Sequence, residues 1–248
     1  MRAIILAAGR GSRMGQLGDA RPKCLVEIAG KSLLERQIAA LRSGGAQEVS
    51  VVRGYRADMI GVPYLTYFQN QRWFETNMVR SLATAAEWLE LGPAIVSYAD
   101  IFYRHELVRE LASAAGDLVI AYDRAWRSLW SRRFVDPLAD AETFQADVSG
   151  RLIEIGNRAT NIDEIQGQYM GLLKFTTPAW REVEALLTTL DAQTIDQLDM
   201  TGLLQRLLRR GTTISTCGTD GQWGEVDNPF DLALYESMAE NGELSLEG

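Results

Sequence analysis

The chain has 248 residues, of which 46% are hydrophobic and 23% are charged, so it is long and apolar enough to bury a sizeable core. Its 33 acidic and 25 basic side chains give a net charge of −8, which argues against a nucleic-acid partner because such partners usually require a basic face. No apolar run approaches the roughly 20 residues that span a bilayer, and the N-terminal run is too short for a signal peptide. With two cysteines, Cys24 and Cys217, the chain is expected to be cytoplasmic and to have no membrane partner.

The first half of the chain alternates between strand and helix patterns. Short apolar runs predict buried strands at 3–8, 48–52, 64–68, 94–98 and 117–122. Helical spacing of apolar residues predicts helices at 32–42, 77–89 and 106–115. The polar, glycine-rich segment 9–23 is expected to be a loop. This alternation is typical of a doubly wound, mostly parallel α/β sheet, whose ligands bind beyond the C-terminal ends of the strands.

The regular alternation stops after residue 122. Segment 125–150 has no clean periodicity, and we expect an insertion or a small antiparallel element there. Further strands are predicted at 151–155, 168–175 and 213–217, and further helices at 178–190, 200–208 and 228–238. No internal repeat or low-complexity linker is visible. We therefore interpret residues 1–248 as a single domain, with an α/β core over 1–122 and an embellished closing region over 123–248.

The segment after the first strand carries the strongest chemical signal. It reads Gly9-Arg10-Gly11-Ser12-Arg13 and continues to Pro22-Lys23. Glycines let the backbone approach a phosphate, and successive N–H groups can hold its oxygens. Arg13 can donate two hydrogen bonds to phosphate oxygens, and Lys23 can place a point charge beside them. The segment lacks the Gly-Lys-Ser/Thr ending of a Walker A loop and the third glycine of a dinucleotide fingerprint. A surface turn with unrelated cations is the alternative.

Asp100 provides the second signal, because it directly follows the apolar strand at 94–98. A carboxylate there is costly to desolvate unless it meets a cation or hydrogen-bond donors. A hard oxygen ligand at a strand end suits Mg²⁺ beside a triphosphate. The alternative is that Asp100 caps a helix that begins after Phe102.

Segment 6–23 resembles the signature of the nucleotidyltransferases that activate sugar 1-phosphates and phosphocholine. The resemblance is specific over the first two-fifths of the chain, and it implies a Rossmann-like nucleotidyltransferase fold with 1–122 as the nucleotide-binding core and 123–248 as the acceptor-binding region. It implies that Arg13 and Lys23 are catalytic and that Asp100 binds the metal. It also implies a second metal-binding carboxylate late in the chain, where Asp227 in Trp223-Gly224-Glu225-Val226-Asp227 matches best. Asp227 can alternatively cap the helix that begins near Pro229.

Segment 75–82 resembles the Asn-x-x-x-Ser-Leu stretch of phosphocholine-type and aminoethylphosphonate-type cytidylyltransferases. Asn77 and Ser81 lie one turn apart at a predicted helix N-terminus, a position that favours anions. Simple helix capping is the alternative reading. Taken together, the resemblance implies nucleotide contacts from Leu6, Ala8, Gly9, Gly11, Ser12, Arg13, Lys23, Asn77, Ser81 and Ala99.

The acceptor side is expected within the second half of the chain. Trp126 and Trp130 lie four residues apart, and with Arg132 they form an aromatic and cationic patch. Such a patch can hold an amine by cation–π contact or a carboxylate through arginine, and its many arginines favour an acceptor with an added negative group over choline. A packing and salt-bridge surface is the alternative. The resemblance also places Gln168, Tyr169 and Glu225 near the acceptor, beside Gly171, which we expect to permit a close approach of the backbone.

These assignments predict a Mg²⁺-dependent nucleotidyltransferase. An oxygen of a phosphorylated or phosphonylated acceptor attacks the α-phosphorus of an NTP, and pyrophosphate leaves. The match at 77–82 favours CTP, with a UTP- or dTTP-dependent sugar-1-phosphate enzyme as the alternative. A glycosyltransferase usually shows Asp-x-Asp, which is absent at Asp100, and an inactive regulatory homologue should have lost one of the four key side chains. A homo-oligomer is compatible with the sequence.

Overall fold

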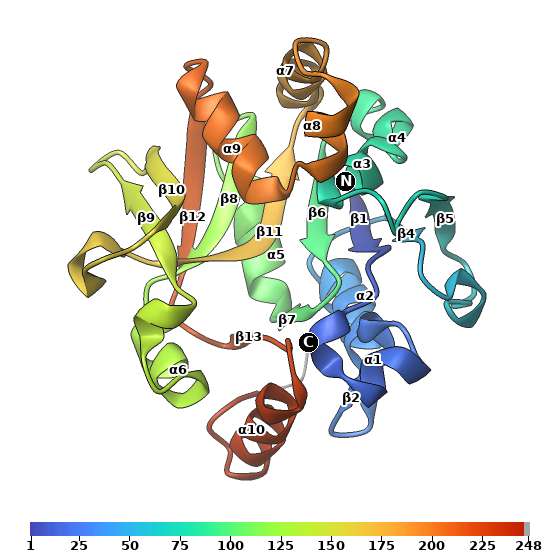
Figure 1. Cartoon of the computed structure of the whole chain (residues 1–248), viewed down its shortest axis with the longest axis vertical. Helices are drawn as coiled ribbons and strands as arrows, with labels where there is room; N and C mark the ends of the chain where they lie inside the picture. Colours follow the sequence, from blue (N-terminus) through green and yellow to red (C-terminus); the bar gives the residue numbers. More distant parts are fainter. Residues whose placement is uncertain (246–248) are drawn as a thin grey trace.

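A computed structural model describes residues 1–245, apart from the side chains of Gln16 and Leu17. Within these residues a seven-stranded sheet forms the centre of the molecule (Figure 1). Among the described strands, the third in the order given next runs antiparallel to both of its neighbours. All other neighbouring pairs in this sheet are parallel. The strands across the sheet are β12 (Ile214–Thr219), β8 (Leu118–Asp123), β11 (Gln168–Phe175), β6 (Ala94–Tyr98), β1 (Arg2–Ala7), β4 (Glu48–Arg53) and β5 (Thr66–Gln69). The predicted doubly wound, mostly parallel sheet is confirmed.

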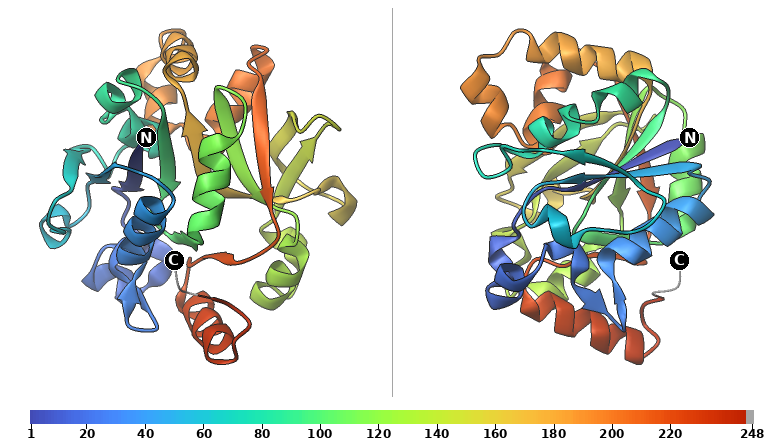
Figure 2. Two further views of the ribbon diagram at one scale, coloured as in Figure 1. Left: turned by 180° about the vertical axis from the view of Figure 1, so that it is seen from behind. Right: turned by 90° about the vertical axis from the view of Figure 1, so that its right-hand side faces the viewer.

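Helices cover both faces of the sheet, as the opposite views in Figures 1 and 2 show. In β1, Ala3 and Ile5 belong to one hydrophobic cluster, whereas Ile4 and Leu6 belong to the other. This alternation explains why the strand is apolar at every position. The first cluster includes residues of α2 (Leu33–Ser43) and α5 (His105–Ser113). The second includes residues of α3 (Met78–Ala83), α4 (Ala86–Glu90), α7 (Thr177–Leu187) and α9 (Met200–Arg209).

Two predicted elements differ from the structure in their local backbone. The predicted helix at 77–89 is divided into α3 and α4, because the turn at Thr84 and Ala85 tightens to hydrogen bonds between residues three apart. The Thr84 hydroxyl donates to the Ser81 carbonyl at 2.7 Å, so it competes with backbone N–H groups of the helix for this acceptor. The predicted loop at 9–23 is wrong in part, since it contains a 3₁₀ turn at Ser12–Met14 and the short helix α1 (Gln16–Ala20). The helix α8 (Ala192–Gln197) was not predicted.

The second half of the chain supplies small elements around the main sheet. The strands β9 (Glu142–Ala146) and β10 (Leu152–Arg158) form an antiparallel pair, which confirms the predicted embellishment. Segment 125–150 also contains a helix, α6 (Trp126–Arg133). Near the N-terminus, β2 (Glu27–Ile28) pairs with β3 (Lys31–Ser32). The chain ends in α10 (Pro229–Glu240), and none of the described helices is long and apolar enough to cross a membrane.

One long-range pairing decides the geometry of the site. The strand β13 (Trp223–Glu225) runs antiparallel to β7 (Ile101–Tyr103), with Glu225 opposite Ile101. The Val226 N–H then donates to the Asp100 carbonyl at 2.9 Å. Because of this pairing, the segment that carries Glu225 and Asp227 lies beside the end of β6, more than 120 residues earlier in the chain.

Candidate active site

A cavity of about 270 Å³ lies beyond the C-terminal ends of β1 and β6, and we call it the glycine-loop cavity. All ten residues for which nucleotide contacts were expected line it. Its wall also contains Trp73 and Tyr98, which the sequence analysis did not single out. The sequence signal for Trp73 is weak, because it is one of two adjacent aromatic residues, with Phe74, in the polar stretch before Asn77.

The glycine loop is shaped by the close approach of Gly11 to Lys23. Gly11 has a φ of 68°, and a Cβ atom there would lie 2.9 Å from the Cβ of Lys23. Only glycine fits this position without strain, because the backbone is left-handed there and a Cβ atom would collide with the Lys23 side chain. The loop therefore presses against Lys23 and helps to direct its side chain toward the carboxylates.

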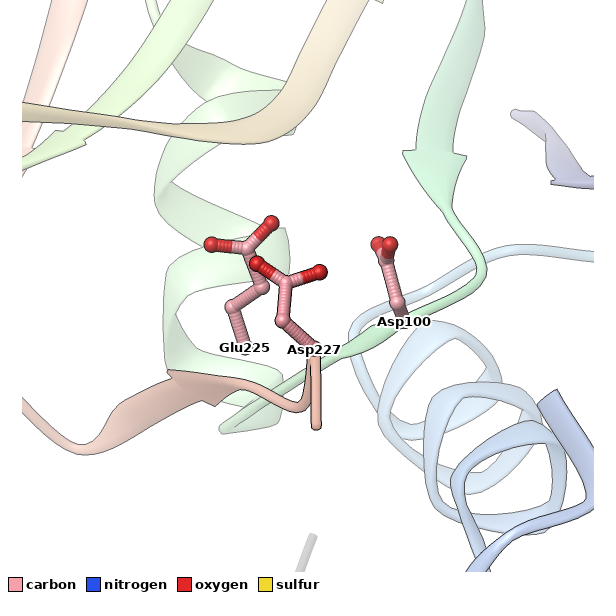
Figure 3. Close-up of side chains that lie close together, drawn as sticks. All are labelled: Asp100, Glu225 and Asp227. Atoms are coloured by element: carbon pink, nitrogen blue, oxygen red, sulfur yellow. The ribbon is translucent and has the colours of Figure 1, made fainter. Parts of the chain in front are cut away.

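Three carboxylates meet at the edge of the cavity. Oxygen atoms of Asp100, Glu225 and Asp227 lie within 4.8 Å of one another, and Figure 3 shows the three groups pointing the same way, Asp100 from the end of β6 and the other two from the segment at β13. Lys23 Nζ donates to Asp100 Oδ2 at 2.8 Å and to Asp227 Oδ1 at 2.6 Å. Arg13 Nη2 lies 2.9 Å from the same Asp227 oxygen. Arg13, Lys23, Asp100 and Asp227 are thus brought together.

The carboxylates of this cluster are balanced by a buried cation of the chain itself, Lys23. Although burial lowers the pKa of Lys23, the charges of Asp100 and Asp227 outweigh it and raise that pKa above its ordinary value. Burial, reinforced by Asp100 and Asp227, raises the pKa of Glu225 to about 8. Lys23 therefore supplies the positive charge that the carboxylates require.

The donor set fits a hard divalent cation. Three carboxylates close enough to share one ion are oxygen ligands of the kind that Mg²⁺ prefers. Asp100 Oδ1 is buried and has no hydrogen-bond partner within the described part of the chain, so it has a free lone pair. The residues present therefore suit the expected Mg²⁺, for which Glu225 would be a third ligand beside Asp100 and Asp227.

The capping alternatives for the two aspartates do not apply. The helix α5 begins at His105 with Arg104 at its N-cap, so Asp100 does not cap it. Asn228, not Asp227, caps α10, and its side chain accepts from the N–H groups of Phe230 and Asp231. Asn77, in contrast, both caps α3 and lines the glycine-loop cavity.

A second cavity, of about 230 Å³, adjoins the first and shares Arg13 and Tyr98 with it. We call it the carboxylate cavity, because four acidic residues line it. Three of the expected acceptor residues, Gln168, Tyr169 and Glu225, lie in its wall. The acidic residues are Asp140, Glu142, Glu225 and Asp227. Asp140 and Glu142 were missed, because the irregular segment 125–150 gave no periodicity from which to orient them.

The expected acceptor contacts of Trp126, Trp130 and Arg132 are wrong. Trp126 and Trp130 are 1% and 0% exposed, and neither lines either of these two cavities. Their faces are buried because α6 packs them inward, with the Trp130 ring 6.0 Å from that of Trp223. Arg132 lines neither of the two cavities and forms an ion pair with Glu243. The alternative reading of this patch as a packing and salt-bridge surface is the correct one.

The neighbouring residue, Arg133, reaches the carboxylates instead. Its side chain is fully buried and ion-paired with Asp231 and Glu225. The spacing of Trp126, Trp130 and Arg133 is that of one helix face, so the sequence contained a signal for this arrangement.

A mostly parallel sheet with a glycine loop, the basic side chains of Arg13 and Lys23 and a carboxylate cluster at its strand ends is the arrangement of a nucleotidyltransferase. Residues 3–154 match the MobA-like NTP transferase domain, and the chain belongs to this family.

Comparison with known proteins agrees with this placement. The chain is 38% identical to the CTP:phosphoglutamine cytidylyltransferase of Campylobacter jejuni over 251 residues, covering 94% of this chain and 98% of that protein. It is 29% identical to the 2-aminoethylphosphonate cytidylyltransferase of Lancefieldella rimae, covering 71% of this chain and 67% of that protein. In fold it is similar to the inositol-1-phosphate CTP transferase of T. maritima, with a TM-score of 0.76, 19% identity and coverage of 98% and 97% of the two chains.

Proposed function

We propose that this protein transfers the CMP unit of CTP to a small phosphorylated or phosphonylated acceptor and releases pyrophosphate. The observation that carries the proposal is that two cavities adjoin at Arg13, with the carboxylate cluster between them. Asp100 lines the glycine-loop cavity, and Asp227 lines the carboxylate cavity. The relative with 38% identity over nearly its whole length supports CTP as the nucleotide. The two cysteines support a cytoplasmic location.

The chain's own groups account for the main steps of this transfer. An oxygen of the acceptor phosphate attacks the α-phosphorus of CTP, a new P–O bond forms, and the bond to pyrophosphate breaks. The acceptor oxygen is already anionic, so no general base has to remove a proton. Lys23 and Arg13 can exchange their carboxylate partners for phosphate oxygens and stabilise the charge that develops at the α-phosphate.

Asp100, Glu225 and Asp227 would hold Mg²⁺, whose charge, when bound, neutralises phosphate oxygens of the nucleotide. The glycines at 9 and 11 let the backbone approach the triphosphate, and the Asn77 side chain lies in the same wall.

The lining of the carboxylate cavity favours an acceptor that carries an amino group. Four acidic side chains and one arginine, Arg13, line this cavity. The arginines around Trp126 and Trp130, which suggested an added negative group on the acceptor, pair with acidic side chains that do not line this cavity. Arg124 pairs with Asp220, Arg127 with Asp163 and Arg132 with Glu243. A phosphorylated amino acid such as phosphoglutamine, the acceptor in the name of the Campylobacter jejuni relative, provides such an ammonium group.

A pyrophosphate-release assay tests this proposal. CTP, UTP, ATP and dTTP are each combined with phosphoglutamine, 2-aminoethylphosphonate, phosphocholine, inositol 1-phosphate and glucose 1-phosphate. We expect the highest kcat/KM for CTP with one of the amino-bearing acceptors. Asp100→Asn and Asp227→Asn should abolish measurable turnover, whereas the matched surface control Asp163→Asn should not change it. Preferred turnover of glucose 1-phosphate with UTP or dTTP would contradict the proposal.

A further inference from the structure

Arg133 is a buried cation behind the carboxylate cluster. It is the last residue of α6, and its side chain is 0% exposed. Its Nε and Nη2 atoms donate to the two carboxylate oxygens of Asp231 at 2.9 and 3.1 Å, which is a two-pronged pair of fixed geometry. The guanidinium also lies over the rings of Trp130 and Phe134, 4.8 and 5.2 Å from their centres. Its position is therefore determined on several sides.

From this position Arg133 contacts two of the three clustered carboxylates. Its Nη1 donates to Glu225 Oε2 at 3.4 Å, and its Nη2 lies 3.6 Å from Asp227 Oδ2. The other oxygen of Asp227, Oδ1, faces Lys23 and Arg13. Arg133 thus lies beside Asp227 Oδ2 and leaves Oδ1 directed toward Lys23 and Arg13, which line the cavities.

Asp231 holds the backbone of the same segment. Its side chain is 1% exposed, and its Oδ2 accepts from the N–H groups of Asp227 and Asn228 at 2.9 and 3.3 Å. The Arg133–Asp231 pair therefore fixes both the main chain and the side chain of Asp227. Lys23 and Arg13 are expected to turn to the nucleotide, whereas the Arg133–Asp231 pair can remain in contact with Glu225 and Asp227.

We propose that Arg133, through its pair with Asp231, is a positioning residue that presets Glu225 and Asp227 to bind the divalent cation. This inference rests on the proposed metal site. Groups that orient metal ligands typically contribute 10- to 100-fold to metal affinity. The charge of Arg133 by itself opposes cation binding, so a positioning role and a purely electrostatic role predict opposite effects when that charge is removed.

The test measures Mn²⁺ binding by electron paramagnetic resonance, without nucleotide, for the wild type, Arg133→Lys, Arg133→Gln and the control Arg127→Lys. Arg133→Lys keeps the charge and loses the two-pronged geometry, and we expect about 10- to 100-fold weaker binding. Arg133→Gln should also bind more weakly, although it loses an opposing charge. Arg127→Lys, on the exposed side of α6, should bind like the wild type. In turnover, Arg133→Lys should raise the Mg²⁺ concentration at half-maximal rate, with the KM for CTP at saturating Mg²⁺ changed by less than about threefold.

Each other result counts against the proposal. Arg133→Lys binding within fivefold of the wild type, or tighter binding by Arg133→Gln, would overturn the positioning role while leaving the metal site intact. Loss of folded structure in both Arg133 variants, seen in the near-ultraviolet circular dichroism of the tryptophans, would assign Arg133 to fold stability and also overturn it. Absence of Mn²⁺ binding by the wild type would overturn the metal site together with this role. None of these results depends on whether CTP is the nucleotide.

Discussion

Lys23 illustrates how a buried charge is made compatible with the fold. Lys23 is only 8% exposed, and an isolated ammonium group at such a position is strongly disfavoured. Hydrogen bonds to Asp100 and Asp227 compensate this cost and keep Lys23 protonated. The same bonds neutralise carboxylates that would otherwise repel one another. Lys23 is therefore stored in charged form beside the place where the phosphates are expected to bind.

We expect Lys23→Met to lower kcat by about 10²- to 10³-fold, because it removes a preset cation from the transition state. Steady-state kinetics with CTP and the best acceptor measure this change. The control is Lys31→Met, since Lys31 is exposed and lines neither of the two cavities, and it should leave kcat unchanged. An increase in KM for CTP with an unchanged kcat would instead assign Lys23 to ground-state binding alone.

At the scale of the secondary-structure elements, α6 connects the core to the site. Its inner face carries Trp126, Trp130 and Arg133, and the Trp130 indole N–H donates to Asp140 Oδ2 at 3.2 Å. Trp130 therefore supports the Asp140 carboxylate, and neither tryptophan lines either of the two cavities.

Trp130→Ala should destabilise the protein by about 3–5 kcal/mol, because it leaves a large void among buried rings. Urea unfolding followed by circular dichroism measures this loss, and Trp130→Phe should lose less. A variant that keeps its stability but has a raised KM for the acceptor would restore the acceptor role that the structure contradicts.

The strand β11 has an irregular register between Tyr169 and Leu173, and Gly171 lies at this point with a φ of 74°. A Cβ atom at Gly171 would lie 2.5 Å from the Tyr98 ring, which lines both cavities. The close approach expected at this glycine is present. Gly171→Ala should cost about 1–3 kcal/mol of folding free energy and displace Tyr98, raising the KM for both substrates.

The control for Gly171→Ala is Gly61→Ala. A Cβ atom at Gly61 would have no atom within 4 Å beyond those of its chain neighbours, so the stability of the Gly61→Ala variant should differ little from that of the wild type. Equal stabilities for the two variants in thermal unfolding would show that Tyr98 moves aside without strain.

At the scale of the whole molecule, the site joins distant parts of the chain. Lys23 and Asp227 are 204 residues apart in sequence, and their hydrogen bond joins the C-terminal segment to the N-terminal part of the core. Ligands that bind on both sides of this junction stabilise the folded molecule, since they bind the native state only.

CTP at about 100 times its Kd, in the presence of Mg²⁺, should raise the free energy of unfolding by about 2.7 kcal/mol and Tm by about 5–10 °C. Differential scanning fluorimetry measures this shift. Asp227→Asn should lose most of the increase that depends on Mg²⁺, whereas Asp163→Asn should retain it. An equal Tm increase with and without Mg²⁺ in the wild type would contradict the metal site.

Local patterns predicted the main strands and helices of the first hundred residues, although the loop at 9–23 and the helix at 77–89 differ in detail. The apolar run at β1, the glycines after it and the polar ends of the strands are properties of neighbouring residues, and the edge of a parallel sheet brings such ends together. For this reason the residues expected around the nucleotide lie in one cavity. Asp227 was found only through family resemblance, because nothing in its neighbourhood indicates the distant Asp100.

The sequence by itself determined the α/β sheet, the glycine loop and the two cations, since strand and loop preferences depend on residues close in the chain. Tertiary structure alone decided that β13 pairs with β7, that Glu225 joins the carboxylates and that the helix face carrying Arg133 packs against them. It also decided that Asp140 lines a cavity while Trp130 is buried. These outcomes depend on which surface each element packs against, and that choice is made by the burial of apolar area across the whole fold.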